Sequence, residues 1–318
     1  DPGPEDLPST DVIIQNFRPG VMEKYGLGYE QLKKKYPGLV YCNISGYGTD
    51  GPYKQLPGQD LLAQAKSGLC YSSGVAGQAP VALGTAVIDT HGAVLAAFGI
   101  VSALIDKLRT GKGHQVDSCL LNAAIHLQIE PFAAYLHHNK IYDKLSSGCV
   151  TRVYDVPYGI YKTLDDYILL SKTPVPKLKE VFGEDAFQKF KDEDVFARRA
   201  DLDAAVAREL ARKTTDEWIE ILSAHDCWFS KINTFEDVIN DPQVIHNGII
   251  AEFENPRGGK VRTLGNPLRI DQAAVPIRKA APELGENTVE LLQEVGYSDR
   301  EIQDLLARKL VVQYQGAE

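Results

Sequence analysis

The apolar positions along the chain alternate between two spacings, one typical of strands and one typical of helices. Short runs rich in β-branched residues at 11–16 and 40–48 predict strands. Apolar residues recur at helical spacing at 27–39 and 59–74. Strands that alternate with helices predict an α/β fold with a mostly parallel sheet.

The most apolar region follows this alternation. Residues 79–89 are predicted to be extended, and residues 90–109 to form a long apolar helix that ends at a TGKGH segment. Residues 115–136 are predicted to begin as a strand and continue as a helix. We expect no apolar run of membrane-spanning length, so the stretch 92–105 is interpreted as a buried helix.

The pattern changes near residue 145. A hairpin with Asp165 and Asp166 at its turn is predicted over 159–171. Thr214 and Ser298 are predicted helix N-caps. The other elements predicted in this half are helices at 176–190, 200–213 and 214–226, a short helical piece around 235–248, two strands within 249–270, and two short helices within 284–312. We therefore expect a large domain (1–150) followed by a smaller α+β domain (151–264); that residues 265–318 return to the large domain is implied only by the family resemblance described below.

Charge and cysteine content exclude several classes of protein. The net charge is −9, which gives no reason to expect a nucleic-acid partner or an anionic membrane surface as partner. Five cysteines are scattered without a CxxC pair, so neither a disulfide framework nor a metal site is expected. This cysteine usage favours a reduced, intracellular compartment.

Asp89 is the strongest candidate for chemistry, because the common catalytic motifs are absent. The sequence has no GxxxxGK[ST] and no GxSxG, and its one GxGxxG match, GYGTDG (46–51), leads into a loop with Gly and Pro rather than into a helix. Asp89 lies in GTAVIDTHGAVLAAFG (84–99), between a predicted strand and a predicted helix. Taken alone, it is best interpreted as an N-cap, and Asp60 near another helix start invites the same interpretation. The alternative is a reactive carboxylate at the strand-to-helix turn.

Several segments taken together resemble a known family. They are DVIIQNFRPGVMEKYGLGYEQL, PGLVYCNISGYGTDGPY followed by PGQDLLAQAKSGL, TAVIDTHGAVLAAFGIVSALIDKLRTGKGHQVDSCLLNAA, and the later PYGIYKT, INTFEDVINDPQV and LGENTVELLQEVGYSDREI. Their order and spacing resemble the class III CoA-transferases, the family of formyl-CoA transferase and carnitine CoA-transferase. The resemblance covers nearly the whole chain, but the family's N-terminal segment, with part of its CoA site, has no counterpart here.

The resemblance implies a Rossmann-like large domain, a smaller α+β domain and an interlocked homodimer. It implies an acyl-CoA:carboxylate CoA-transferase with coenzyme A or acyl-CoA as substrate, a carboxylic acid as acceptor and no tightly bound cofactor. We expect no nucleic-acid or membrane partner. We expect the protein in the cytoplasm, or in the mitochondrial matrix in a eukaryote.

The same resemblance assigns roles to residues. Asp89 would attack the acyl-CoA thioester, forming an aspartyl anhydride and then an aspartyl-CoA thioester. Asp60 and Gln59 would orient the substrate. The residues expected to bind CoA are Asn16, Arg18, Lys24 and Tyr25.

Two alternatives stay open from the sequence. The related α-methylacyl-CoA racemases have a catalytic histidine at the position of Gln59, paired with the aspartate at position 89. Gln59 cannot accept a proton at neutral pH, which favours transfer over racemisation. The other alternative is a non-catalytic CoA-binding homologue.

Overall fold

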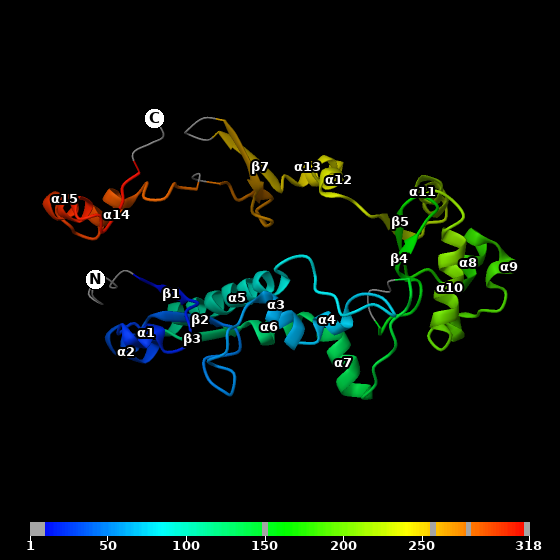
Figure 1. The fold of residues 1–318 in the computed structure, drawn as a ribbon, viewed down its shortest axis with the longest axis horizontal. Helices are drawn as coiled ribbons and strands as arrows, with labels where there is room; N and C mark the ends of the chain where they lie inside the picture. The colour runs from blue at the N-terminus through cyan, green and yellow to red at the C-terminus, as the bar shows by residue number, and fades with distance from the viewer. Residues whose placement is uncertain (1–9, 148–151, 255–258, 278–280, 315–318) are drawn as a thin grey trace. The chain divides into compact units, whose positions relative to one another are not determined.

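The computed structural model describes most of the chain in two compact units, residues 1–232 and 233–318 (Figure 1). The described residues are 10–147, 152–254, 259–277 and 281–314. Cys149 lies outside them. The domain limits expected from the sequence (1–150, 151–264 and 265–318) stay a prediction.

The first unit begins with alternating strands and helices and ends with an antiparallel sheet and its helices. Its alternating elements are β1 (Val12–Gln15), α1 (Val21–Lys24), α2 (Tyr29–Lys35), β2 (Val40–Ser45), α3 (Asp60–Lys66), α4 (Leu69–Ser72), α5 (Val87–Thr110), β3 (Gln115–Cys119), α6 (Leu120–Leu127) and α7 (Ile129–His138). These are followed by β4 (Tyr158–Lys162), β5 (Tyr167–Ser171), α8 (Val175–Phe182), α9 (Glu184–Phe187), a 3₁₀ turn (Asp192–Asp194), α10 (Arg199–Leu210), α11 (Thr215–Ala224) and β6 (Trp228–Lys231).

The predicted parallel sheet is confirmed. Within the described residues β1, β2 and β3 pair in parallel and in that order. Because successive side chains of a strand face opposite sides, Val40 and Cys42 pack against α5 while Tyr41 packs on the other face with Leu32 of α2. The sheet is therefore covered on both faces, as an α/β fold requires.

The expectation of an extended run at 79–89 is wrong. Within the described residues this segment forms no strand, and α5 begins at Val87 rather than at residue 90. Its backbone groups bond to α3 and α4 instead of a neighbouring strand. The Val81 amide donates to the Cys70 carbonyl at 3.1 Å, and the Leu83 amide donates to Gln64 Oε1 at 2.9 Å. These tertiary bonds hold the segment as a loop.

Helix α5 also differs from its prediction as a buried helix. By length and composition it could cross a membrane, contrary to the expectation from the sequence, although core helices of soluble proteins pass the same test. Only 28% of its most apolar window is buried. Its exposed apolar side chains repeat at intervals of four and three residues, the spacing of a helix–helix seam. They are Val94, Phe98, Val101, Ile105 and Leu108.

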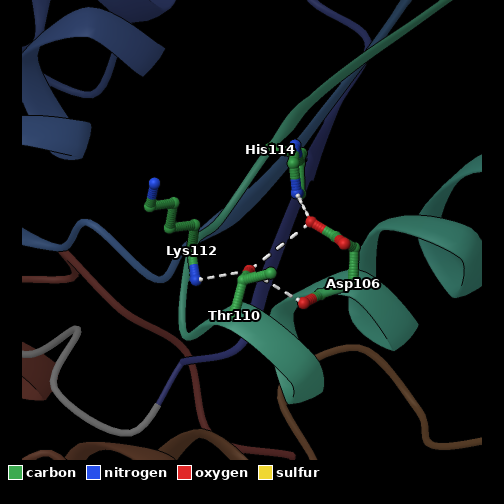
Figure 2. A network of polar contacts seen from close by, with 4 residues as sticks. All are labelled: Asp106, Thr110, Lys112 and His114. Carbon is green, nitrogen blue, oxygen red and sulfur yellow. Dashed lines mark hydrogen bonds and ion pairs between the residues drawn. The ribbon is translucent and has the colours of Figure 1, made fainter.

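A polar network closes the C-terminal end of α5 (Figure 2). Asp106 Oδ2 lies 2.7 Å from His114 Nε2, and the Thr110 hydroxyl donates to the Asp106 carbonyl at 2.9 Å. The Lys112 amide donates to Thr110 Oγ1 at 3.2 Å. Gly111 has a φ of 72°, a left-handed conformation that suits glycine at a helix end. The predicted TGKGH stop is confirmed, and it turns the chain directly into β3.

The predicted hairpin at 159–171 is confirmed, and it lies in a larger sheet. Strands β4 and β5 pair antiparallel, and β6, which the sequence analysis did not foresee, pairs antiparallel with β5. The sheet and helices α8 to α11 enclose a core that includes Leu170, Leu178 and Trp218. Strand β6 has only four residues and its outer positions are exposed, so it carries little apolar alternation.

Asp165 at the hairpin turn links the sheet to α11. Its Oδ1 atom accepts hydrogen bonds from the Thr215 amide at 2.8 Å and from the Thr163 hydroxyl at 3.1 Å. The Thr215 backbone bond, followed by those from the threonine hydroxyls, holds the pKa of Asp165 below its usual value. Thr214 caps the same helix in a capping box with Glu217, as predicted.

We expect Asp165→Asn to lower the free energy of unfolding at pH 7, because the amide replaces the ionised acceptor. A carboxyl with a depressed native pKa stabilises the fold above its unfolded pKa, about 4, and this contribution is lost as the pH falls through the native value. The difference between wild type and variant should therefore shrink below about pH 4. Urea unfolding at several pH values measures it. A difference that is unchanged at low pH would contradict the ionic origin.

The second unit contains short hairpins and helices. Its elements are α12 (Phe235–Asn240), α13 (Pro242–Asn247), β7 (Ile250–Glu254), β8 (Lys260–Leu264), β9 (Arg269–Ile270), β10 (Ala273–Ala274), α14 (Thr288–Glu294) and α15 (Asp299–Ala307). Strands β7 and β8 pair antiparallel, which confirms the two predicted strands. The Ser298 hydroxyl accepts from the Glu301 amide, which confirms that predicted cap.

Candidate active site

Asp60 and Asp89 meet where the starts of α3 and α5 come together. Asp60 is the first residue of α3 and is 92% buried, with 8% of its surface exposed. Its Oδ2 atom accepts hydrogen bonds from the backbone amides of Ile88 at 2.7 Å and Asp89 at 3.1 Å. Its Oδ1 atom accepts from Gln64 Nε2 at 2.6 Å. Asp60 thus binds two free amides of the first turn of α5, although it lies 28 residues away from Ile88 along the chain.

Neither aspartate occupies the N-cap position that the sequence suggested. The residue at the N-cap of α5 is Ala86, and Asp89 lies inside the first turn. The residue at the N-cap of α3 is Gln59, whose side chain makes no capping bond to the described residues. The strand-to-helix setting proposed for Asp89 is also wrong, because a loop precedes the helix. Capping of α5 comes from Asp60, a contact that no local sequence pattern reveals.

The position of Asp89 sets its electrostatics. A helix N-terminus favours an anion by about 0.3–1 kcal/mol. Against this, partial burial of the carboxyl, and then the nearby charge of Asp60, raise the pKa of Asp89 above its usual value. The residue is nevertheless exposed at the surface of the chain. Asp89 is therefore an accessible carboxylate with a perturbed pKa, a combination that is common at reactive sites.

A close contact between two glycines places Asp60. Gly46 follows β2 and Gly58 precedes α3, and the backbones touch so closely that a Cβ on Gly58 would lie 2.4 Å from the Gly46 Cα atom. No real side chain fits this gap, so both positions require glycine. The contact holds the start of α3 against the carboxyl end of the parallel sheet, where ligand sites of α/β folds gather.

We expect Gly58→Ala to lower the free energy of unfolding by about 1–3 kcal/mol, because the added methyl group forces the two backbones apart. Activity should fall as well, since Asp60 moves with the start of α3. Gly84→Ala is the matched control, because its Cβ meets no atom within 4 Å. Urea unfolding and CoA-transfer rates measure both effects. Equal effects of the two substitutions would contradict the role of the glycine contact.

A histidine pair lies close to Asp89 along the chain. His91 Nε2 and His126 Nδ1 are 3.0 Å apart, and the two rings are tilted by only 17°. This hydrogen bond ties the first turns of α5 to α6. His91 is not among the residues expected to act in catalysis, and its side chain bonds to His126 rather than to Asp89.

The four predicted CoA-binding residues lie around the turn after β1. Asn16, Arg18, Lys24 and Tyr25 are all exposed, and Lys24 ends the short helix α1. A cavity of about 450 Å³ opens beside them, but none of the four is among its lining residues. That cavity instead includes Gln15, Phe17, Pro19, Asn43 and Lys54, together with Glu23 and Glu30. The structure therefore brings the four residues to the edge of a cavity and does not bring them to Asp89.

A polar row across the sheet was not identified from the sequence. Gln15, Asn43 and Asp117 occupy matching positions on the three parallel strands. Gln15 Nε2 donates to Asn43 Oδ1 at 2.6 Å, and Asn43 Nδ2 donates to Asp117 Oδ1 at 2.8 Å. Gln15 and Asn43 line the same 450 Å³ cavity. A polar residue within each strand was the available signal, but the strand register is needed to align the three.

The described part of the chain was also compared with the needs of metal ligation and thiol chemistry. Within it, no group of three or more His, Cys, Asp and Glu side chains is placed to hold a metal ion. The cysteines it includes, Cys42, Cys70, Cys119 and Cys227, are free thiols. Burial raises the pKa of Cys42 and Cys227, which makes them poor nucleophiles at neutral pH.

Comparison with known proteins identifies the family of the chain. Residues 7–288 match the model of CoA-transferase family III. The human succinyl-CoA:glutarate CoA-transferase is 31% identical over 96% of this chain and 71% of its own length. The cinnamoyl-CoA:phenyllactate CoA-transferase of Clostridium sporogenes is 29% identical over 95% and 75%. The human alpha-methylacyl-CoA racemase is 30% identical over 95% and 79%.

Solved structures show the same fold. A CAIB/BAIF family protein from Brucella suis superposes with a TM-score of 0.74 at 28% identity, covering 90% of this chain and 75% of that chain. A protein from M. tuberculosis superposes with a TM-score of 0.72 at 25% identity, covering 88% and 74%. The chain belongs to CoA-transferase family III and is a CoA-transferase.

Proposed function

We propose that this chain is an acyl-CoA:carboxylate CoA-transferase that carries the acyl group and then CoA on Asp89. The observation that carries the proposal is the exposed Asp89 carboxyl in the first turn of α5, next to the buried Asp60 carboxylate that binds the same turn. Family membership supports the reaction class. The expected acceptor is a carboxylic acid, as the names of the transferase relatives indicate for those proteins.

The proposed reaction uses only acyl exchange. An oxygen of ionised Asp89 attacks the thioester carbon of the donor, the C–S bond breaks, and CoA thiolate leaves an aspartyl anhydride. The thiolate then attacks the aspartyl carbon of the anhydride, which releases the donor acid and forms an aspartyl-CoA thioester. The acceptor carboxylate attacks this thioester and expels CoA thiolate. The thiolate attacks the acceptor's acyl carbon, so that acceptor-CoA leaves and Asp89 is free again.

The proposed supporting roles follow from the contacts. Both carboxylate oxygens of Asp60 are used within the chain, so we assign it the positioning of Asp89 rather than direct substrate contact. Gln59 is exposed beside it and makes no side-chain hydrogen bond to the described residues, so it is available to a substrate. Because Asp89 is exposed in the single chain, bound CoA or a second copy must exclude water from the anhydride.

Binding of CoA is proposed at the turn after β1. Arg18 and Lys24 are exposed and form no ion pair with the described carboxylates, so their charges are available to CoA phosphates. Asn16 and Tyr25 lie on the same turn. CoA enters as a substrate, and no tightly bound cofactor is proposed. We also propose an interlocked homodimer and a cytoplasmic or mitochondrial-matrix location, and the exposed apolar positions of α5 are a surface that a second copy could cover.

Trapping of the covalent intermediate tests the proposal against its alternatives. The chain is incubated with succinyl-CoA and a panel of other acyl-CoA donors, treated with hydroxylamine and analysed by peptide mass spectrometry. A hydroxamate on Asp89 supports the transferase. The racemase relative makes proton exchange the second reaction to measure. Exchange of the α-proton with solvent, without modification of Asp89, would establish racemisation instead, and the absence of both would indicate a non-catalytic CoA-binding homologue.

A further inference from the structure

A second cavity lies at the end of α3 that is remote from Asp60. It has a volume of about 270 Å³ and is bounded by the α3–α4 junction, α7 and the segment that follows α7. Figure 1 shows α4 and α7 next to each other at this end of the layer. Asp60 and Asp89 do not line it. The seven residues of α3 separate the cavity from Asp60 by about 10 Å along the helix axis.

The floor of the cavity is a buried amide. Gln128 is only 6% exposed, and its Nε2 atom lies within hydrogen-bond distance of the Ala124 carbonyl at 2.9 Å and the Ser67 carbonyl and hydroxyl at 3.2 Å. Its Oε1 atom accepts no hydrogen bond from the described residues. This amide oxygen can therefore accept a hydrogen bond from a ligand or a water molecule. The floor therefore offers one hydrogen-bond acceptor to whatever enters.

The walls are aromatic and apolar. Tyr71, Phe132, Tyr135 and Ile141 line the cavity, and three of these side chains, those of Tyr71, Tyr135 and Ile141, are exposed. Tyr142, also a wall residue, is held by an edge-to-face contact with Phe196 at a centroid distance of 4.7 Å. Exposed aromatic side chains around a small cavity favour a flat apolar or aromatic ligand.

The rim carries two positive charges. The Arg152 guanidinium lies 4.6 Å from the centre of the Tyr71 ring and donates to the Tyr71 carbonyl at 3.0 Å. Its Nε atom is buried and has no hydrogen-bond partner among the described residues. Lys140 Nζ lies 4.7 Å from the centre of the Tyr142 ring. Neither cation forms an ion pair with a carboxylate of the described residues, and no Asp or Glu is among the lining residues.

We propose that this cavity binds a small aromatic carboxylate that also carries a hydroxyl group. Its carboxylate meets Lys140 and Arg152, its ring lies against Tyr71 and Phe132, and its hydroxyl donates to Gln128 Oε1. The cavity is a ligand site separate from the proposed reaction centre. Neither Asp60 nor Asp89 lines the cavity, and α3 lies between it and Asp60, so a ligand bound there is not in contact with the Asp89 carboxyl.

The test uses three probes on the whole chain: 4-hydroxyphenylacetate, phenylacetate and 2-phenylethanol. Titration calorimetry and saturation-transfer NMR measure their affinities. We expect the hydroxylated acid to bind best, phenylacetate more weakly and the neutral alcohol weakest. Arg152→Gln and Lys140→Gln should each weaken binding of the acids about tenfold, because each removes a charge-assisted contact. Lys162→Gln, which removes an exposed lysine of β4, is the matched control and should change nothing.

Asp89→Asn separates this proposal from the proposed function. If it leaves the affinity unchanged while Arg152→Gln weakens binding, the site is the cavity, whether or not the chain transfers CoA. Binding that is lost in Asp89→Asn and kept in both cation variants would overturn the proposal and place the ligand at the reaction centre. Equal affinity for the acid and the alcohol, or no binding of any probe, would also overturn it. Thermal unfolding verifies that each variant is folded.

Discussion

Replacing Asp89 by asparagine is expected to abolish CoA transfer, with a loss of roughly 10⁴-fold or more in kcat. The amide keeps the size of the side chain but is not a nucleophile, so neither the anhydride nor the aspartyl-CoA thioester can form. Because Asp89 is exposed and its backbone amide remains bonded to Asp60, the fold should tolerate the change. Steady-state transfer from succinyl-CoA measures the effect.

Two measurements, of thermal unfolding and of CoA binding, serve as controls for Asp89→Asn. The thermal midpoint should stay close to that of wild type, and CoA should still bind, since the proposed CoA contacts lie on the turn after β1. Hydroxylamine should trap no adduct at position 89. Transfer that continues at more than a few per cent of the wild-type rate would show that the nucleophile is another residue.

Replacing Asp60 by alanine is expected to lower both stability and activity. Three donors lose their buried acceptor, the amides of Ile88 and Asp89 and the Gln64 side chain, which costs about 1–3 kcal/mol of unfolding free energy. The first turn of α5 then loosens and Asp89 shifts, so kcat/KM should fall roughly 10- to 100-fold. Urea unfolding and initial rates measure the two losses. Asp50→Asn, at an exposed loop position, is the control.

Asp60→Asn removes the charge and keeps the size of the side chain, although the amide retains only one of the two acceptor atoms. Burial and then the Asp60 charge raise the pKa of Asp89, so removing the charge should lower that pKa. Transfer needs ionised Asp89, and the acid limb of the pH–rate profile should therefore move to lower pH. An acid limb that stays in place, or moves to higher pH, would contradict the electrostatic link between the two carboxylates.

Much of the fold could be predicted because its signals are local. Alternating spacings in the sequence predicted β1, α2, β2 and β3, and the turn residues predicted the hairpin around Asp165. Thr214 with Glu217 and Ser298 predicted helix starts, since a capping box lies within four residues of chain. Strand β6 was not predicted because its four residues, three of them exposed, show no clear apolar alternation. Its pairing with β5 also depends on a partner far along the chain.

The wrong structural predictions lie mainly around Asp89, where contacts between residues distant in the chain override the local preference for secondary structure. The run before it looks extended, yet α3 and α4 bind its backbone and hold it as a loop. The family resemblance identified Asp60 and Asp89 together but could not show that one caps the helix of the other. The CoA residues Asn16, Arg18, Lys24 and Tyr25 stay a prediction, and the cavity beside them is lined by their neighbours.

The sequence by itself determined the likeness to the class III CoA-transferases, because an ordered set of segments specifies the family, and Gln59 favoured transfer over racemisation within it. It also placed the Asp89 carboxyl near the start of the long helix, because apolar spacing indicates where a helix lies to within a few residues. Only the tertiary structure decided the position of that carboxylate. The close contact between Gly46 and Gly58 places Asp60, and Asp60 binds the first turn of α5, which carries Asp89. Such contacts join residues that are distant in the chain, and their energies depend on burial that no local pattern records.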